Sequence, residues 1–391
     1  MAAENVGATA LRCTGQREVG SLRMNWHRIH RLGLVVGIIT LLASACGGSS
    51  TTADNWGTAT SAAGNGGMDA LVAAAKKEGK LNIIAVPRDW ANYGAVIDGF
   101  TAKYGLAITS DNPTGSSQDE VNAVQQLGAS NRAPDVLDIG MSVALANTTL
   151  FAPYQVSTWN DIIAAQKEPT GLWVQDYGGY MSIGYDSSKV PAVTSLQDLL
   201  GSGFKGKVAL NGDPTKANAA LNGVMMASLA NGGSVDDVSK GVDFFHQLKL
   251  KGNFVPVQAT TATVKNGTTP VVFDWDYLSA GHGKDVPTWK VFVPSSAILL
   301  DFYAQAVSKT APHPAAARLW EEYLYSDEGQ NLWLKGLARP VRMAAMTTSG
   351  KIDATAAAAL PKADGTPIRL TPDQATAAKA YLAAHWAAAI S

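Results

Sequence analysis

Cysteine is almost absent from this chain of 391 residues. The two cysteines that occur, Cys13 and Cys46, both lie near the N-terminus. With so few thiols, neither a disulfide framework nor a thiolate metal site can form. The six histidines are scattered along the sequence without the spacing of metal ligands. We therefore expect no metal centre and no cofactor.

An excess of charge of one sign is also absent. The net charge is −1, from 31 basic and 32 acidic side chains, and the two signs are interspersed along the chain. Without a basic stripe, the sequence offers no electrostatic footprint for a nucleic-acid partner.

Motifs of catalysis are missing or out of context. A G-x-G-x-x-G match at residues 201–206 follows a short predicted helix and precedes a strand, which is the reverse of a dinucleotide site. S-x-x-K at 202–205 and S-D-N at 110–112 occur in the wrong order, and no K-T-G accompanies them. We expect no enzymatic activity, and we keep a secreted enzyme only as an alternative of another class.

Long apolar runs are absent except for residues 32–46, LGLVVGIITLLASAC. Basic residues precede this run, and small residues and Cys46 close it. About 14 apolar residues are too few for a permanent span, which takes roughly 20. The order basic, apolar, small is typical of a secretory signal. We therefore expect residues 1–46 to be an N-terminal extension and signal peptide, with translation starting at Met24 rather than at Met1.

The end of this run resembles the lipobox of bacterial lipoproteins, although leucine stands four places before Cys46 instead of three. The resemblance implies that Cys46 carries acyl chains such as palmitate and anchors the protein on the extracytoplasmic face of the cell membrane. Residues 47–67, rich in glycine, serine and threonine, are expected to form a flexible tether.

The part of the chain after the tether alternates predicted strands and helices. Strands are expected at 81–86, 106–110 and 136–139, and helices at 90–104 and 119–127. Such alternation predicts a parallel sheet with helices on its faces. The chain after residue 46, about 345 residues, exceeds what one core usually supports, so we expect two lobes.

The order of these segments resembles that of the extracellular solute-binding proteins of ABC importers. The similar class is type II, which includes polyamine, ferric-iron and phosphonate binders. The resemblance implies a small-molecule solute, an ABC permease with its ATPase as partners, and a monomer. The segments that carry it are LNIIAVPRDWANYGAVIDGFTAKYGLAI, APDVLDIG, YMSIGYDSSKV, FKGKVALNGDP and HPAAARLWEEYLYSDEGQNLWLKGLARPVR.

The resemblance implies an α/β, two-lobed periplasmic-binding-protein type II fold with a hinge and an interlobe cleft. The hinge would lie near residues 181–185 and 293–297. Applied to this chain, lobe 1 comprises residues 68–179 and 295–343, and lobe 2 comprises residues 180–294 and 344–391.

The loops that follow predicted strands are the expected binding site, because open α/β sheets bind ligands beyond the carboxyl ends of their strands. Aromatic faces beside carboxylates suit a cation. In polyamine binders, which this chain resembles, a tryptophan and an aspartate match Trp275 and Asp301. The candidate ligand-binding residues are Arg88, Asp89, Trp90, Ser116, Ser117, Met141, Tyr177, Asn211, Trp275, Asp276, Tyr277 and Asp301.

The charge of the solute stays open at this point. A cationic amine such as spermidine or putrescine is the first hypothesis. The alternative is an anion of the phosphonate type, held by Arg88 and by the amides of Ser116 and Ser117 at a helix start. Structural roles also stay open, since Trp275 could fill the core, Asp301 could cap a helix or a hinge, and Arg88 could pair with Asp89.

Overall fold

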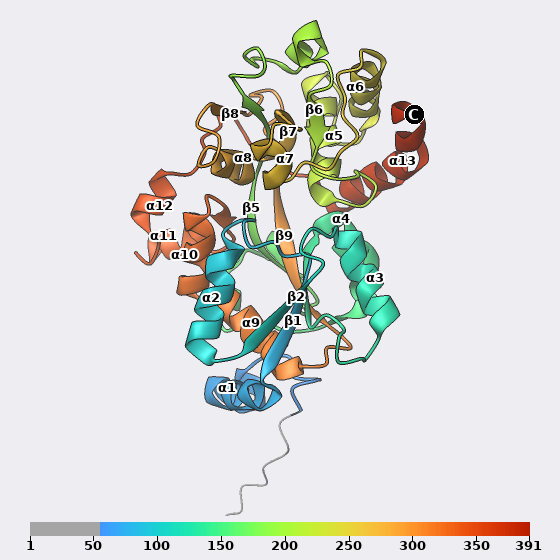
Figure 1. Cartoon of the computed structure of the whole chain (residues 1–391). Coiled ribbons are helices and arrows are strands. Elements are labelled where there is room, and N and C mark those ends of the chain that lie inside the picture. The colour runs from blue at the N-terminus through green and yellow to red at the C-terminus, as the bar shows by residue number, and fades with distance from the viewer. Residues whose placement is uncertain (1–54) are drawn as a thin grey trace, which may run out of the picture. The chain divides into compact units, whose positions relative to one another are not determined.

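Two long strands, β5 (Val174–Asp186) and β9 (Leu300–Ser308), join the two lobes of the computed structural model, which describes residues 55–391 (Figure 1). β5 pairs with β9 up to Tyr180, and from Met181 onward it pairs with β7 and β8. The sheet order is β3-β9-β5-β7-β6. The other strands are β1 (Lys80–Ile84), β2 (Ala107–Asp111), β3 (Val136–Gly140), β4 (Phe151–Ala152), β6 (Val208–Leu210), β7 (Val271–Trp275), β8 (Trp289–Phe292) and β10 (Arg339–Pro340).

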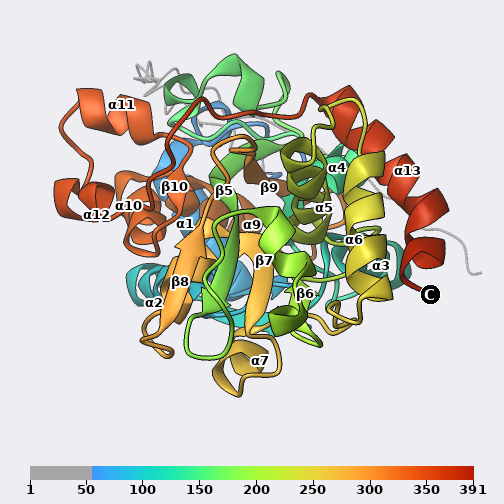
Figure 2. The same cartoon turned by 90° about the horizontal axis from the view of Figure 1, so that it is seen from above.

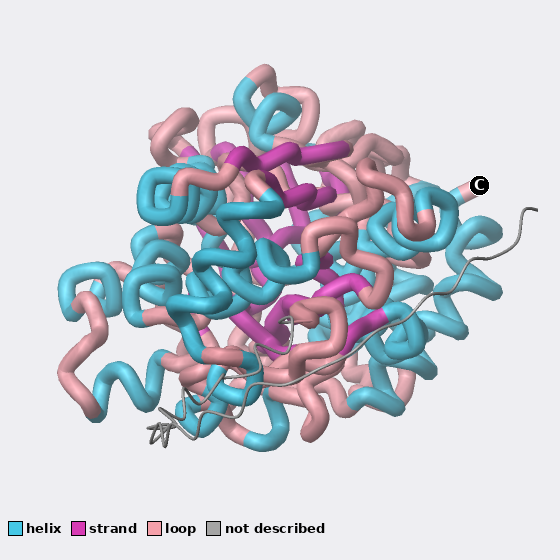
Figure 3. The backbone as a smooth tube through the Cα atoms, turned by 90° about the horizontal axis from the view of Figure 1, so that it is seen from below, coloured by secondary structure: helices cyan, strands magenta, loops and turns pink. Residues whose placement is uncertain are grey.

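Helices surround these strands, as Figure 3 shows. We call first lobe the part with strands β1 to β4 and second lobe the part with β6 to β8. The helices of the first lobe are α1 (Gly67–Glu78), α2 (Tyr93–Tyr104), α3 (Ser117–Leu127), α4 (Met141–Ala144), α9 (Pro314–Leu324) and α10 (Asp327–Lys335). Those of the second lobe are α5 (Asn218–Ala230), α6 (Ser239–Leu250), α7 (Thr261–Lys265) and α8 (Asp276–His282).

Local capping signals explain where several helices begin. The capping box that opens α3 has Ser116 at the N-cap and Asp119 as its partner. Asp213 does not cap α5. Its carboxylate instead accepts hydrogen bonds from the backbone and hydroxyl of Thr215, and the helix begins at Asn218.

Residues 55–67 are packed against the first lobe, whereas the sequence predicts a flexible tether there. The indole of Trp56 is buried. Arg318 of α9, itself buried, donates hydrogen bonds to the carbonyls of Ala59 (2.8 Å) and Gly57 (3.3 Å). The partner that orders this segment is about 260 residues away in sequence, so composition alone could not reveal it. Met24, Cys46 and the signal segment lie outside the described residues.

The C-terminal part divides between the lobes. Its helices are α11 (Met343–Thr348), α12 (Ala354–Ala358) and α13 (Pro372–Ile390). Near α12, the backbone N–H of Asp353 donates to Asn331 of α10, so this stretch lies on the first lobe, and the assignment of all of 344–391 to lobe 2 is wrong here. Trp386 of α13 instead packs edge-on against Phe245 of α6. Figure 2 shows α13 beside α6, on the side opposite α10 and α12.

Within residues 55–391, no helix combines the length and the apolar character that a membrane span requires.

Candidate functional site

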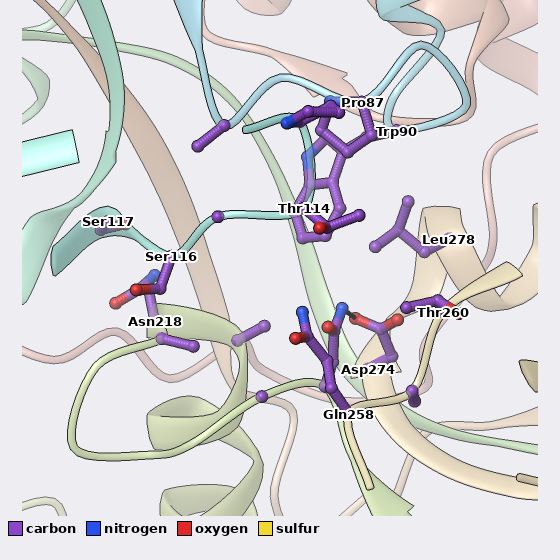
Figure 4. Close-up of a pocket in the computed structure, with 18 of the residues that line it drawn as sticks. Pro87, Trp90, Thr114, Ser116, Ser117, Asn218, Gln258, Thr260, Asp274 and Leu278 are labelled. Atoms are coloured by element: carbon purple, nitrogen blue, oxygen red, sulfur yellow. Dashed lines mark hydrogen bonds between the residues drawn. The ribbon is translucent and has the colours of Figure 1, made fainter. Parts of the chain in front are cut away.

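A pocket of about 410 Å³ lies between the two lobes (Figure 4). The first lobe contributes the loops that follow β1 and β2, together with side chains of β3 and β9. The second lobe contributes the loop after β6, the segment that leads into α7, and parts of β7 and α8. The polar and aromatic side chains of the lining include Asp89, Trp90, Thr114, Ser116, Ser117, Glu120, Asp138, Asn211, Asn218, Gln258, Thr260, Asp274, His282 and Tyr303.

Five of the residues proposed from the sequence line this pocket. They are Asp89, Trp90, Ser116, Ser117 and Asn211. All five follow β1, β2 or β6, at the carboxyl ends of strands that pair in parallel. The other seven, which do not line it, are Arg88, Met141, Tyr177, Trp275, Asp276, Tyr277 and Asp301.

Arg88 points away from the pocket. Its guanidinium forms an ion pair of 2.6 Å with Asp98 of α2, and both side chains are more than half exposed. The alternative pairing with Asp89 is therefore not formed, and the guanidinium does not enter the pocket as an anion clamp.

Trp275 and Tyr277 pack behind the pocket wall. Trp275 is buried and stacks on Tyr277 with ring centroids 6.4 Å apart. Tyr277 and Tyr303 in turn meet the ring of Trp90 edge-on, at 6.3 and 5.7 Å. These rings support the ring of Trp90, which lines the pocket together with Tyr303.

The carboxylates of Asp276 and Asp301 are engaged elsewhere. Asp276 forms an ion pair of 2.8 Å with Arg339. Asp301 accepts hydrogen bonds from Asn218 (3.0 Å) and Asn222 (3.1 Å) of α5. Since Asn218 lines the pocket, Asp301 contacts a wall residue and not the pocket itself. Met141 lies in an apolar cluster of the first lobe.

Asp138 of β3 is the most unusual group in the lining. Its Oδ2 accepts a hydrogen bond of 2.7 Å from the hydroxyl of Tyr177. Its Oδ1 is buried and has no hydrogen-bond partner among residues 55–391. Burial raises the pKa of Asp138 to about 7. The hydroxyl groups of Tyr177 and Tyr93 act against this rise, because each stabilises the ionised carboxylate.

A second acid stands directly beside Asp138. Glu120 of α3 is buried, and its carboxylate accepts a hydrogen bond of 3.0 Å from the backbone N–H of Asp138. Burial, and then the nearby charge of Asp138, raise the pKa of Glu120 well above its usual range. The first-lobe wall therefore carries two carboxyl groups that cannot both ionise cheaply without a cation.

Asp274 is the corresponding buried acid of the second lobe. It accepts hydrogen bonds from the side chain of Asn211 (2.9 Å) and the backbone of Trp275 (2.8 Å). Burial raises the pKa of Asp274 to about 7. The strand β7 continues to Trp275, and side chains alternate between faces along a strand. Asp274 therefore faces the pocket while its neighbours pack inward.

The charge balance of the lining is acidic. The carboxyl groups there are Asp89, Asp119, Glu120, Asp138, Asp213 and Asp274, and the basic groups are Lys216 and His282. Lys216 lies 3.6 Å from Asp213, and burial lowers the pKa of His282. A lining with more acids than bases attracts a cation.

The buried acids predict how the stability of the unliganded protein depends on pH. Asp138 and Asp274 have pKa values of about 7 in the folded protein and about 3.9 in an unfolded chain. Between these two pH values the folded state therefore binds more protons than the unfolded state. The free energy of unfolding should fall as the pH rises from about 4.5 to 7.5, by up to about 1.4 kcal/mol per unit and per group. Urea unfolding at several pH values measures this slope. Asp138→Asn should make the slope less steep, because it removes one of these two groups. An unchanged slope would contradict the raised pKa of Asp138.

Comparisons with known proteins agree with this architecture. A family model described as bacterial extracellular solute-binding protein matches residues 135–364. No curated protein matches the chain.

Similar solved structures cover almost their full length. Iron-bound HitA from Pseudomonas aeruginosa is 20% identical and covers 79% of this chain and 99% of its own, with a TM-score of 0.60. AgtB from A.tumefacien R10 with agropinic acid is 18% identical and covers 80% and 98%, with a TM-score of 0.62. AfuA from Actinobacillus pleuropneumoniae, with fructose-6-phosphate bound, is 16% identical and covers 80% and 99%, with a TM-score of 0.60. At such identities the likeness is one of fold, and it confirms the predicted two-lobed periplasmic-binding-protein fold.

Proposed function

This chain belongs to the family of bacterial extracellular solute-binding proteins, and we propose that its pocket captures a small solute carrying amino groups, such as spermidine or putrescine. One observation carries the proposal. Asp138, a buried carboxyl group of the pocket lining, has tyrosine hydroxyls and no lysine or arginine as side-chain partners among the described residues. An ammonium group supplies the missing positive charge and a charge-assisted hydrogen bond.

Two further features support a cation. Asp274 brings a second buried carboxyl group from the other lobe, so a solute with two amino groups would pair with both lobes at once. Trp90 presents an aromatic face, and Figure 4 shows it entering the pocket opposite Asp274. A cation over a tryptophan ring gains about 0.5–2 kcal/mol.

The family places the protein outside the cytoplasm. We infer that the lobes close on the solute about the point where β5 changes partner, between Tyr180 and Met181, and that a membrane permease driven by an ATPase receives it. In this proposal the chain acts as a monomer, performs no covalent chemistry, and is held at the membrane by acyl chains on Cys46. Lobe 1 then includes residues 68–179, and lobe 2 residues 180–294.

The anionic alternative is less well supported. Arg88 is paired with Asp98 outside the pocket. At the start of α3, the carboxylate of Asp119 already accepts hydrogen bonds from the backbone and hydroxyl of Ser116. A bound anion would meet that negative charge.

A thermal-shift screen of the purified protein tests the proposal. The panel holds diamines and polyamines, phosphonates and dicarboxylates, and ferric ion. A ligand at 100 times its dissociation constant adds about 2.7 kcal/mol of stability, which raises the Tm by several degrees. Amines should give this shift. A response to phosphonates alone, lost in Arg88→Ala, would overturn the proposal in favour of an anion receptor.

A further inference from the structure

The hydroxyl of Tyr177 connects two pocket side chains that come from different elements. Tyr177 lies on β5, is fully buried, and does not line the pocket. The indole Nε1 of Trp90 lies 2.7 Å from its hydroxyl oxygen, and the Oδ2 of Asp138 also lies 2.7 Å from it.

The direction of these two hydrogen bonds follows from chemistry. An indole N–H can only donate, and a hydroxyl has a single proton. Tyr177 therefore accepts from Trp90 and donates its proton to Asp138. Oδ2 of Asp138 is thus the oxygen bonded to Tyr177, while the buried Oδ1 has no hydrogen-bond partner among the described residues.

The ring of Tyr177 is held on several sides, so its hydroxyl has little freedom to move. It stacks on Tyr303 with centroids 5.8 Å apart and planes 11° from parallel. Tyr93 meets it edge-on at 5.8 Å, and Trp333 lies at 5.0 Å. The position of the hydroxyl is thus set by packing and not by the solute.

We propose that Tyr177 is a positioning residue that couples the charge of Asp138 to the orientation of the Trp90 ring. When Asp138 becomes an anion, its hydrogen bond from Tyr177 becomes charge-assisted. The polarised hydroxyl is then a better acceptor for the Trp90 indole, because hydrogen bonds in a chain strengthen one another. The ionised pocket therefore holds the Trp90 ring more firmly in place. The consequence for the solute rests on the proposed function, whereas the coupling itself does not.

Other titratable groups also act on Asp138, and none of those in the described residues is a lysine or arginine. A pH measurement must therefore distinguish the titration of Asp138 from that of these neighbouring groups. The variant Asp138→Asn, in which only the neighbours titrate, serves as the reference. These groups are Glu120 of α3, Asp176 of β5, Tyr93 of α2, Tyr277 of α8, Tyr303 of β9, Glu321 of α9 and Tyr325 just after α9.

The first test needs no solute. The indole N–H resonance of Trp90 in the full-length protein is assigned by its loss in Trp90→Phe and followed from pH 5 to 9. We expect it to titrate with Asp138 in the wild type and to stop titrating in both Asp138→Asn and Tyr177→Phe. Tyr154→Phe is the matched control, since it removes a buried hydroxyl that is bonded to Glu322 at 2.8 Å and is not among the groups that act on Asp138. An indole titration that survives in Tyr177→Phe would overturn the inference.

The second test uses putrescine and spermidine with calorimetry. Loss of the Tyr177 donor raises the pKa of Asp138, so Tyr177→Phe should weaken binding about tenfold at pH 7 and clearly less at pH 9. In an Asp138→Asn background the same change should add no pH dependence. A loss that is equal at both pH values would mean that Tyr177 only supports the fold. If the wild type binds neither amine, the proposed function fails while the indole titration still decides the coupling.

Discussion

Asp138→Asn is expected to weaken the binding of a diamine about 100-fold, with little change in the fold. The amide keeps the size of the side chain and an oxygen that can accept from Tyr177. It removes the charge that an ammonium group would meet, and hydrogen bonds to charged groups contribute about 1.5–3 kcal/mol. Calorimetry at pH 8, where the wild-type carboxyl group is ionised, measures the difference.

Asp274→Asn should act in the same direction and by a similar factor, because Asp274 is the buried acid of the other lobe. Together the two changes are expected to reduce affinity about 10⁴-fold if their effects add. Arg88→Ala is the control of opposite charge, since its side chain pairs with Asp98 on the surface. Wild-type affinity in Asp138→Asn would contradict the ammonium assignment.

The loops after β1, β2 and β6 could be placed at the pocket from the sequence alone. Parallel strands present their carboxyl ends at one edge, and apolar runs mark β1 and β6. Asp89, Trp90 and Asn211 lie in the loops after these two strands and line the pocket. For these residues local pattern and sheet geometry were sufficient.

Asp274, the buried pocket acid of the second lobe, is absent from the predicted site residues because β7 is longer than the apolar run that marks it. The apolar run stops at Phe273, whereas β7 includes Asp274 and Trp275. In a strand, one residue of difference moves a side chain to the other face. Trp275 therefore lies in the core, and the acid just before it lines the pocket.

Asp138 could not be identified from its neighbours in sequence. It lies in the strand VLDIG, where every residue is buried. A single acid among such apolar residues does not by itself indicate a binding site. Its chemistry comes from Tyr177 on β5 and Glu120 on α3, which only the tertiary fold brings near. The same limit applies to Trp56, whose segment is held by Arg318 of a distant helix.

Gly140→Ala is expected to weaken solute binding at least 100-fold by blocking the approach of the lobes. Gly140 ends β3 in the first lobe, with φ −65° and ψ 140°, values that alanine adopts without strain. A methyl group there would lie 2.2 Å from the Cβ of Asn218. Asn218 begins α5 of the second lobe and is bonded to Asp301, so the clash arises between lobes rather than within one.

The unliganded protein can relieve that clash by opening, so its free energy of unfolding should change by less than about 1 kcal/mol. Calorimetry gives the affinity, and small-angle scattering with saturating amine should show a larger radius of gyration than the wild type. Gly281→Ala in α8 is the matched control, because no atom lies within 4 Å of its added methyl group. Because Asn218 also lines the pocket, the scattering measurement separates blocked closure, which enlarges the radius of gyration, from a displaced wall residue, which does not. Full affinity would instead mean that the solute binds with the lobes further apart than they are here.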